Sequence, residues 1–410
     1  MVAVEPVALR FVRPEWSHEV PSPPHDALSA EARRQHLIDH PRSYLGVTRS
    51  PEDVDHDTVD PAGEAMRLSR ASLETLLAQN VFEPTRSPGL YLYRLEEPGH
   101  RQTGLICGVG SAAYDAGQVR IHERVKQPRA DLLARHLDQV GAQSSPIAMA
   151  FQSSPEIESI IDRVTTTTDP FIDLLDGDLR QSIWSVPDPR DVDAVCAALA
   201  PEHLYLIDGH HRAAAASAHQ RLAGTTGHLM LSVLFPFAEL RNLAFHRIVA
   251  PVDGDRLLQD LGSRFATVPA TPAEVVDRAD GWIGLAVGGS ETHWHLVELP
   301  PPPGWELDID PVRLAQHVLH PLFGIDESVG DPRLVHQPGP GDLDAVTGLQ
   351  LGPGQVAFLM RPVPGDVLLH VADRGGTMPP KSTYFVPKVR SGLFVRLTDP
   401  TLSGEAGVTP

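Results

Sequence analysis

The chain has 410 residues, a formal net charge of −19 at pH 7 and 41% hydrophobic residues. This length suffices for two or three ordinary domains or for one large mixed domain. The negative charge argues against general nucleic-acid binding, because proteins that bind the phosphate backbone need a basic face. The two cysteines, Cys107 and Cys196, are too few for a disulfide framework, which suits a reducing cytoplasm.

No stretch of the sequence reaches the apolar length of a membrane span, and the first residues lack the basic and apolar regions of a secretory signal. We therefore expect a cytoplasmic protein with neither membrane nor nucleic-acid partners. The 39 prolines favour many short elements joined by rigid turns over a helical bundle.

The predicted elements mix helices and strands along the whole chain. Ser29 is expected to cap a helix at 30–39, and a second helix is expected at 64–80. Periodicity then predicts strands at 90–95, 102–109, 146–151 and 230–235, and helices at 129–140, 155–163 and 189–199. Later strands are predicted at 242–250, 282–287, 292–298, 355–360 and 367–372, with one helix at 311–322. Because helices and strands interleave without strict alternation, the predicted fold class is α+β, a mixed α/β arrangement.

The most informative segment is Asp208-Gly209-His210-His211-Arg212, which follows the apolar run 204–207 and precedes a helix-prone run. A strand, a tight turn and a helix are therefore expected here. The start of a helix binds anions, phosphates above all, through its first N–H groups and its dipole. Gly209 permits a sharp turn, and Asp208 can cap the helix, accept a proton or hold a metal. We interpret the segment as a phosphate-handling turn, and a structural turn or a metal site stays open as an alternative.

A second candidate is Glu123, which lies between His122 and Arg124. A glutamate beside a histidine and an arginine can act as a general base or as a Mg²⁺ ligand. A surface glutamate would look the same in the sequence, so this alternative stays open.

A third candidate is the loop 378–388, in which prolines fix the backbone around Lys381 and Lys388. Such a loop can present its lysines to phosphates as point charges. It can equally be an edge strand with solvated lysines, which protect against aggregation. If the first interpretation holds, the loop should fold over the turn at 208–212.

Several strings, taken in order, together resemble one family, the bacterial and archaeal domain of unknown function 1015, which is often associated with serine metabolism. They are SPPHD at 22–26, HPRSYLGVTR at 40–49, IHE at 121–123, SPI at 145–147, LYLIDGHHR at 204–212, HR at 246–247 and MPPKSTYFVPK at 378–388. In the first string the family usually has a tyrosine before the aspartate. The resemblance covers nearly the whole chain.

The stretch from 121 to 212 also resembles the core of the ParB/sulfiredoxin-like superfamily, whose free-serine kinases carry the same DGHHR turn and an upstream catalytic glutamate. The resemblance implies a ParB/sulfiredoxin-like catalytic core at 81–240. An N-terminal segment at 1–80 would pack on this core, and a C-terminal α+β part at 241–410 would carry the lysine loop. The implied activity is Mg²⁺-assisted phosphoryl transfer from ATP or ADP to the hydroxyl of free serine or a related amino acid. A homodimer is an open possibility.

The resemblance also implies roles for individual residues. Glu123 would activate the substrate hydroxyl, and Asp208 would assist it or hold Mg²⁺, with His210 as a third catalytic residue. The implied phosphate-binding set is Gly209, His211, Arg212, Lys381, Ser382 and Lys388, and the implied substrate-binding set is Asp26, His122, His246 and Arg247. Phosphoryl transfer depends mainly on positioning and charge neutralisation, which suits these residue types.

The sequence departs from the family pattern after two of these motifs. Val125 stands where the family usually has a threonine, Ala130 and Leu132 interrupt an acidic patch, and 213–215 are alanines in place of Tyr-Glu-Thr. These changes mark either a different substrate or a reduced activity. Two alternatives therefore remain: a ParB-like nucleotide-binding switch with slow or no hydrolysis, and a metal-dependent hydrolase centred on Asp208, His210 and His211.

Overall fold

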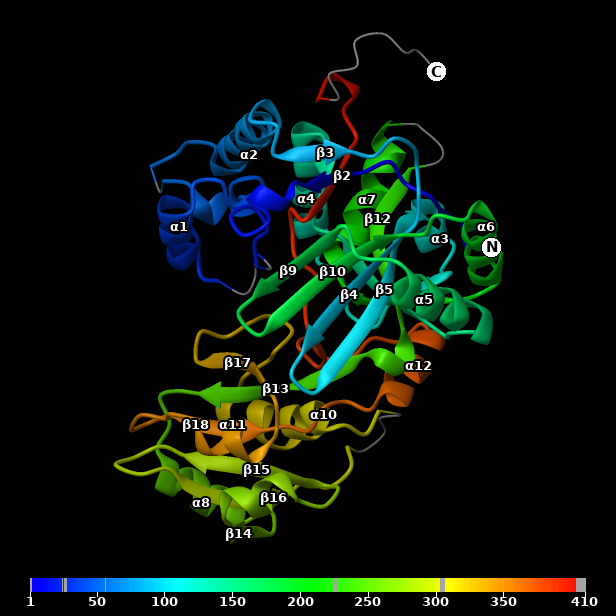
Figure 1. The fold of residues 1–410 in the computed structure, drawn as a ribbon. Helices are drawn as coiled ribbons and strands as arrows, with labels where there is room; N and C mark the ends of the chain where they lie inside the picture. The colour runs from blue at the N-terminus through cyan, green and yellow to red at the C-terminus, as the bar shows by residue number, and fades with distance from the viewer. Residues whose placement is uncertain are drawn as a thin grey trace. The chain divides into compact units, whose positions relative to one another are not determined.

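The structure, a computed structural model, describes residues 2–23, 25, 28–55, 57–223, 228–302 and 307–402. The chain divides into two compact units, and Figure 1 traces it from end to end. The larger unit comprises Met1–Ile121, Val125–Leu240 and Pro387–Pro410, and the smaller unit comprises His122–Arg124 and Arg241–Val386. Each unit combines sheet and helix, so the predicted α+β class is confirmed.

The larger unit is built on a sheet that has nine strands within the described residues, in the order β6-β11-β8-β12-β5-β4-β10-β9, with β1 paired to β5. Most neighbours are antiparallel, but β12 runs parallel to β8 and β11 runs parallel to β6. The strands are β1 (Val4–Glu5), β4 (Tyr91–Glu97), β5 (His100–Gly110), β6 (Val119–Arg120), β8 (Ile147–Phe151), β9 (Ile172–Asp176), β10 (Leu179–Ser185), β11 (Leu204–Asp208) and β12 (Leu229–Pro236).

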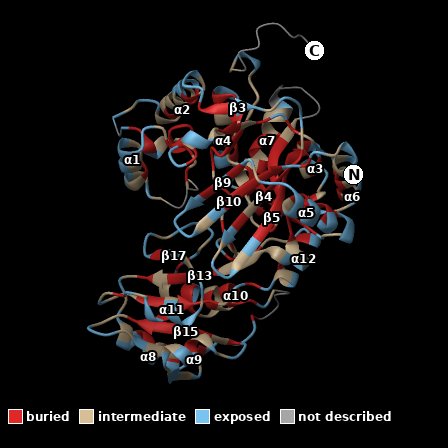
Figure 2. Cartoon of the chain, in the orientation of Figure 1, coloured by how far each residue is buried: buried red, intermediate tan, exposed pale blue. Residues whose placement is uncertain are grey.

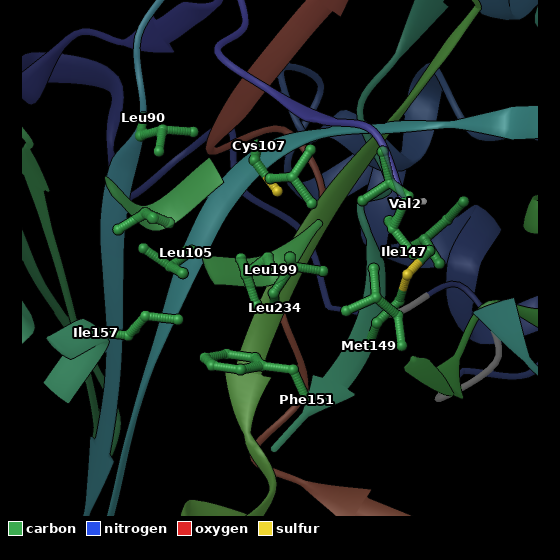
Figure 3. Close-up of a cluster of buried hydrophobic side chains, with 14 of the residues drawn as sticks. Val2, Leu90, Leu105, Cys107, Ile147, Met149, Phe151, Ile157, Leu199 and Leu234 are labelled. Carbon is green, nitrogen blue, oxygen red and sulfur yellow. The ribbon is translucent and has the colours of Figure 1, made fainter. Parts of the chain in front are cut away.

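The hydrophobic core of this unit packs against the sheet. Strand β5 contributes Leu105, Cys107 and Val109, which alternate along the strand and so share one face. Helix α5 (Pro155–Thr167) and helix α6 (Pro189–Leu199) pack against them through residues three and four apart. Figure 3 shows side chains from β5, β8, β12, α5 and α6 in this cluster, and Figure 2 shows that much of the sheet is buried. Each such buried side chain stabilises the fold by about 1.5–3 kcal/mol.

Within the described residues, the larger unit also contains a second, small sheet and five more α-helices. The sheet has the order β3-β2-β20-β7 and consists of β2 (Arg10–Val12), β3 (Phe82–Pro84), β7 (Ala142–Gln143) and β20 (Phe394–Leu397). The helices are α1 (Ala30–Asp39), α2 (Pro61–Ala78), α3 (Ser111–Asp115), α4 (Gln127–Val140) and α7 (His210–Ala223). Ser29 caps α1 by accepting a hydrogen bond from the Ala32 N–H, as predicted.

The smaller unit has its own sheet, in the order β14-β16-β15-β18-β13-β17, with β19 paired to β13. Its strands are β13 (Arg241–Val249), β14 (Thr267–Pro269), β15 (Trp282–Val287), β16 (His293–Glu298), β17 (Leu334–Gly339), β18 (Val356–Leu359) and β19 (Tyr384–Val386). Its α-helices are α8 (Gly254–Gly262), α9 (Pro272–Val276), α10 (Asp310–Leu314), α11 (Leu343–Thr347) and α12 (Gly365–Asp373). Across the described parts of the chain, no helix is both long and apolar enough to span a bilayer.

The strand predicted at 367–372 is wrong, because this segment lies in helix α12. Leu368, Val371 and Ala372 are buried at the three- and four-residue spacing of one helical face. A short apolar run does not by itself distinguish a buried strand from a buried helix. The helix predicted at 311–322 begins as α10 but continues as a π-helix over Ala315–Phe323, with Pro321 inside it. A proline inside a helix removes one N–H and crowds the carbonyl four residues earlier, which disturbs regular α geometry.

Candidate functional site

The segment 208–212 forms the predicted strand, turn and helix. Strand β11 ends at Asp208, and helix α7 begins at His210. Gly209 has φ +96°, in the region that side chains rarely adopt, and its carbonyl accepts the first helical hydrogen bond, from Ala213 N–H at 2.9 Å. A Cβ added at Gly209 would lie 2.9 Å from both Nε and Nη2 of Arg212. The glycine therefore allows both the turn and the close approach of the Arg212 side chain.

Asp208 binds two cations at this turn. Arg212 Nη2 donates to one carboxylate oxygen at 2.6 Å, and Lys388 Nζ donates to the other. Burial alone would raise the pKa of Asp208, but Lys388 and Arg212 outweigh burial and hold this pKa well below its usual range. Asp208 is therefore ionised at neutral pH. The contact that we expected between the lysine loop and the turn is present at Lys388.

The two histidines of the turn differ in burial. His210 is buried. His211 Nε2 accepts a hydrogen bond from the backbone N–H of Lys126 at 3.1 Å, and this bond joins the start of α4 to the start of α7. Since Nε2 accepts, the proton of the neutral ring lies on Nδ1. Lys126 was missed by our sequence analysis, although composition offers a signal: the chain has only three lysines, Lys126, Lys381 and Lys388.

Three of the motifs that are far apart in the sequence meet beside this turn. Arg212 Nη2 also donates to the carbonyl of Pro146 at 3.3 Å, within the SPI string. The neighbouring Ser145 hydroxyl bonds to the hydroxyl of Ser391 at 2.8 Å, three residues after Lys388. Ser391 in turn forms an antiparallel bridge with Ser22, at the start of the SPPHD string. Successive contacts within the larger unit therefore connect residues of these three strings to the 208–212 turn.

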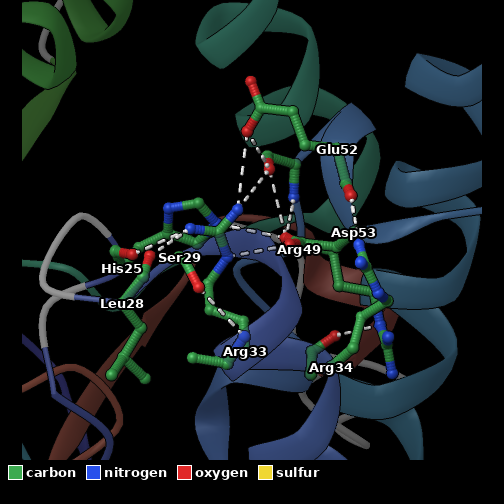
Figure 4. Close-up of polar contacts among 11 residues, drawn as sticks. His25, Leu28, Ser29, Arg33, Arg34, Arg49, Glu52 and Asp53 are labelled. Atoms are coloured by element: carbon green, nitrogen blue, oxygen red, sulfur yellow. Dashed lines mark hydrogen bonds and ion pairs between the residues drawn. The ribbon is translucent and has the colours of Figure 1, made fainter. Parts of the chain in front are cut away.

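Figure 4 shows the polar contacts that join His25, within the SPPHD string, to Arg33 and Asp53. Arg33 Nε donates to Asp53 Oδ1 at 2.8 Å, and both side chains are almost fully buried. His25 Nε2 lies 3.2 Å from Asp53 Oδ2, and the His25 carbonyl accepts from Arg33 Nη1 at 3.2 Å. Burial alone would raise the pKa of Asp53, but His25, Ser50 and Arg33 together hold it well below its usual range. The network fixes His25, while the expected substrate contact Asp26 lies outside the described residues.

The remaining candidates lie in the smaller unit. His122 is buried, its Nε2 lies 3.1 Å from the Thr383 hydroxyl, and its carbonyl accepts from Met378 N–H at 2.8 Å. The IHE string is thus bound to the loop 378–383 at both of these points. Glu123 follows His122 directly and is half-buried. The smaller unit therefore contains both Glu123, the candidate base, and Lys381, the first lysine of the loop.

Lys381 is exposed and has φ +55°, which is rare for a residue with a side chain. Its ammonium nitrogen lies 5.3 Å from the centre of the Phe245 ring, within the range of a cation–π contact. The next residue, Ser382, is buried and donates its hydroxyl proton to the Pro379 carbonyl at 2.8 Å. Within this part of the loop, the Lys381 side chain is therefore exposed to solvent, and the Ser382 hydroxyl stabilises the backbone of the loop itself.

The two residues expected to bind substrate on β13 are both buried. His246 Nδ1 accepts from Met360 N–H at 3.2 Å, and burial lowers the pKa of His246 to about 4. Arg247 has no exposed surface, and its guanidinium bonds to Glu327 and to three backbone carbonyls.

The residues at the turn do not form a metal cage of their own. Within the described ranges, no group of three or more histidine, cysteine, aspartate or glutamate side chains is placed to hold an ion. Both Asp208 oxygens are bonded to cations. Mg²⁺ is commonly bound by one or two carboxylates together with substrate phosphates. A Mg²⁺ ion at this turn would therefore depend on ligands that a nucleotide brings.

The family described as "Protein of unknown function (DUF1015)" matches residues 6–314 of the chain. No curated protein matches it. Solved structures with some likeness include a free serine kinase carrying a Glu-to-Gln substitution, in complex with AMP, at 14% identity and a TM-score of 0.34, covering 67% of this chain and 89% of that one. SbnI from Staphylococcus aureus, truncated at its C-terminus, is 11% identical with a TM-score of 0.38, and the match covers 74% of this chain and 90% of that one. A conserved hypothetical protein from Pyrococcus furiosus is 15% identical with a TM-score of 0.33, and the match covers 67% of this chain and 92% of that one.

Proposed function

The chain belongs to the DUF1015 family, and from this membership together with the geometry of the 208–212 turn we propose that it is a small-molecule kinase. It would transfer a phosphoryl group from ATP or ADP to the hydroxyl of free serine or of a related amino acid. The motifs that resemble free-serine kinases, the DGHHR turn and the upstream glutamate, supply the expected activity.

The observation that carries this proposal is the pair of cations around Asp208. Arg212 and Lys388 against one carboxylate leave the turn with a net charge of +1, in a chain whose total is −19. A phosphate can accept hydrogen bonds from both cations and lie at the start of α7, where the helix dipole favours negative charge. A structural turn would not require a lysine from 180 positions away in the sequence.

In the proposed reaction, the acceptor hydroxyl oxygen attacks the terminal phosphorus of the nucleotide, and the bond from that phosphorus to the leaving phosphate oxygen breaks. The hydroxyl proton passes to Glu123. Arg212 and Lys388 neutralise charge on the phosphates, and Asp208 holds both cations in place between turnovers. His122 orients the acceptor beside Glu123. Mg²⁺, when bound with the nucleotide, would supply further neutralisation of the phosphate charge.

An acceptor screen tests the proposal. Purified protein with Mg²⁺ and either ATP or ADP is incubated with a panel of hydroxyl amino acids, and phosphorylated products are detected by mass. We expect a product with serine or a relative, and its loss in Glu123→Gln. The matched control is Glu298→Gln, which changes an exposed glutamate of the same unit. Equal turnover in both variants would refute the role of Glu123.

The departures after Glu123 and after Arg212 favour a second candidate, a nucleotide-binding switch. The residues that replace the family pattern include Val125, and the alanines at 213–215 follow the turn directly. A switch would bind nucleotide through Arg212 and Lys388 but give no product with any acceptor. Lys388→Met should then abolish nucleotide binding, whereas Glu123→Gln should leave binding unchanged.

A further inference from the structure

We propose that Arg247 is a positioning residue that sets the conformation of Lys381, with Glu327 as its counter-ion. The inference rests on the proposed function and on the phosphate-binding role that the family resemblance implies for Lys381. It gives the HR string a role different from the substrate contact expected from the sequence.

Arg247 is a fully buried arginine whose hydrogen bonds point at the loop. Nε donates to Glu327 Oε1 at 2.9 Å, while Nη1 and Nη2 donate to the carbonyls of Lys381 at 3.0 Å and Pro380 at 3.2 Å. Nη1 also donates to the Phe245 carbonyl at 2.7 Å. Burying a charge is costly unless it is paired and hydrogen-bonded. Here the guanidinium fork holds two successive carbonyls of the loop, which the single ammonium of a lysine could not match.

Glu327 is itself buried and is held as a carboxylate. Burial alone would raise the pKa of Glu327, but His336 and Arg247 lower it below its usual range. His336 Nε2 lies 2.9 Å from Glu327 Oε1. The ion pair is therefore a preformed unit beneath the loop, and it does not depend on a ligand for its charge balance.

The same strand fixes the side chain of Lys381. Phe245 and Arg247 are two residues apart on β13, so they share one face of the strand. Arg247 holds the Lys381 carbonyl in the left-handed conformation, and the Phe245 ring receives the ammonium. A left-handed conformation is unfavourable for a residue with a side chain, and it persists only where surrounding contacts impose it. Arg247 is the residue that imposes it here.

The loop has a second attachment, at the IHE string. His122 bonds to the Thr383 hydroxyl and accepts from Met378 N–H, so the residue before Glu123 is bound to the same loop. Within the smaller unit, Arg247 therefore controls Lys381 directly and the surroundings of Glu123 through the loop.

A purely structural role would be shared with other buried arginines, and Arg278 supplies the matched control. Its side chain is also buried in the smaller unit, and it donates to the carbonyls of Val275 at 2.6 Å, Trp282 at 3.1 Å and Leu359 at 2.9 Å. It pairs with Asp310 at 3.8 Å. None of these partners lies in the loop 378–383.

The test compares Arg247→Lys with Arg278→Lys in the full chain. Each variant and the unmodified protein are treated with an amine-reactive reagent with and without ADP, and modification of Lys381 is mapped by mass spectrometry. The mapping is simple because the unmodified chain has three lysines and each variant adds only one. We expect both variants to lower the unfolding temperature. Only Arg247→Lys should lose the protection of Lys381 by ADP, and it should raise KM for the nucleotide on the order of tenfold with kcat changed by less than about threefold.

The outcomes are distinguishable. Equal protection of Lys381 in the two variants would overturn the positioning role. Absence of protection in the unmodified protein, together with absence of product, would instead overturn the proposed function on which the inference rests. If Arg247→Lys does not fold, Glu327→Gln replaces it, because this change keeps the side-chain volume and removes only the counter-ion charge. Loss of Lys381 protection in Glu327→Gln then supports the inference, and normal protection refutes it.

Discussion

Replacing Asp208 by asparagine tests the electrostatic account of the turn. The change keeps the shape of the side chain but removes the charge that both Arg212 and Lys388 bind. The side chains of Asp208, Arg212 and Lys388 are 25%, 34% and 18% exposed, so the cluster is neither fully buried nor at the surface. Exposed ion pairs contribute about 0–1 kcal/mol, and breaking a buried one costs about 3–5 kcal/mol. We therefore expect Asp208→Asn to lower the free energy of unfolding by about 2 kcal/mol.

The pH dependence of this loss follows from the depressed pKa of Asp208. An aspartate whose pKa is lower in the folded state contributes stability above its unfolded pKa of about 3.9, and this contribution is lost as the pH falls toward the folded value. Between pH 5 and 7 the difference between the two proteins should therefore be constant. Below pH 4 the unmodified protein should lose this advantage, and the two curves should converge.

Urea denaturation at pH 7, followed by circular dichroism, measures the effect. The control is Asp173→Asn, which breaks a surface pair with Arg180 whose side chains are 35% and 59% exposed. The control should lose less than about 1 kcal/mol, and most of that should disappear in high salt. The reasoning is refuted if Asp208→Asn loses no more than the control, or if its loss disappears in salt to the same extent.

Three further predictions follow from the same geometry. Gly209→Ala should weaken nucleotide binding, because the new Cβ would approach the Arg212 guanidinium. The control is Gly177→Ala, where φ is also positive but the space around the new Cβ is open, so this change should cost only about 1–2 kcal/mol of backbone strain. Isothermal titration with ADP measures nucleotide binding in both variants. Arg33→Met should lower the free energy of unfolding by about 3–5 kcal/mol, because it leaves a buried carboxylate unpaired. Arg67→Met, which removes a pair at the surface, should change the free energy of unfolding much less in the same urea titrations. His246 has a pKa of about 4 in the folded protein, so the unfolded chain binds its proton first as the pH falls. The free energy of unfolding should therefore fall by up to about 3 kcal/mol between pH 6.5 and pH 4. His246→Gln should remove this part of the pH dependence, and an unchanged pH dependence would contradict the assignment.

Local signals in the sequence determined much of the secondary structure and the chemistry of one turn. The helix at 30–39 begins after its serine cap, the helix at 189–199 matches α6, and the strand, turn and helix around Gly209 are as predicted. These features depend on residues within one or two helical turns of each other, so caps, glycine and periodicity are sufficient to specify them. The apolar run at 367–372 satisfied both a strand and a helix pattern, and only its packing decided for the helix.

The tertiary structure decided which of these residues act together. The pairing of Lys388 with Asp208 and that of Arg33 with Asp53 leave no periodic signal, because the partners lie on different elements. The resemblance implied a substrate contact for Arg247; the structure shows a fully buried side chain that donates to the Lys381 carbonyl, from which we propose its support of Lys381. Charge pairs of this kind are strong only where folding excludes water and aligns several donors at once, and the fold alone supplies that condition.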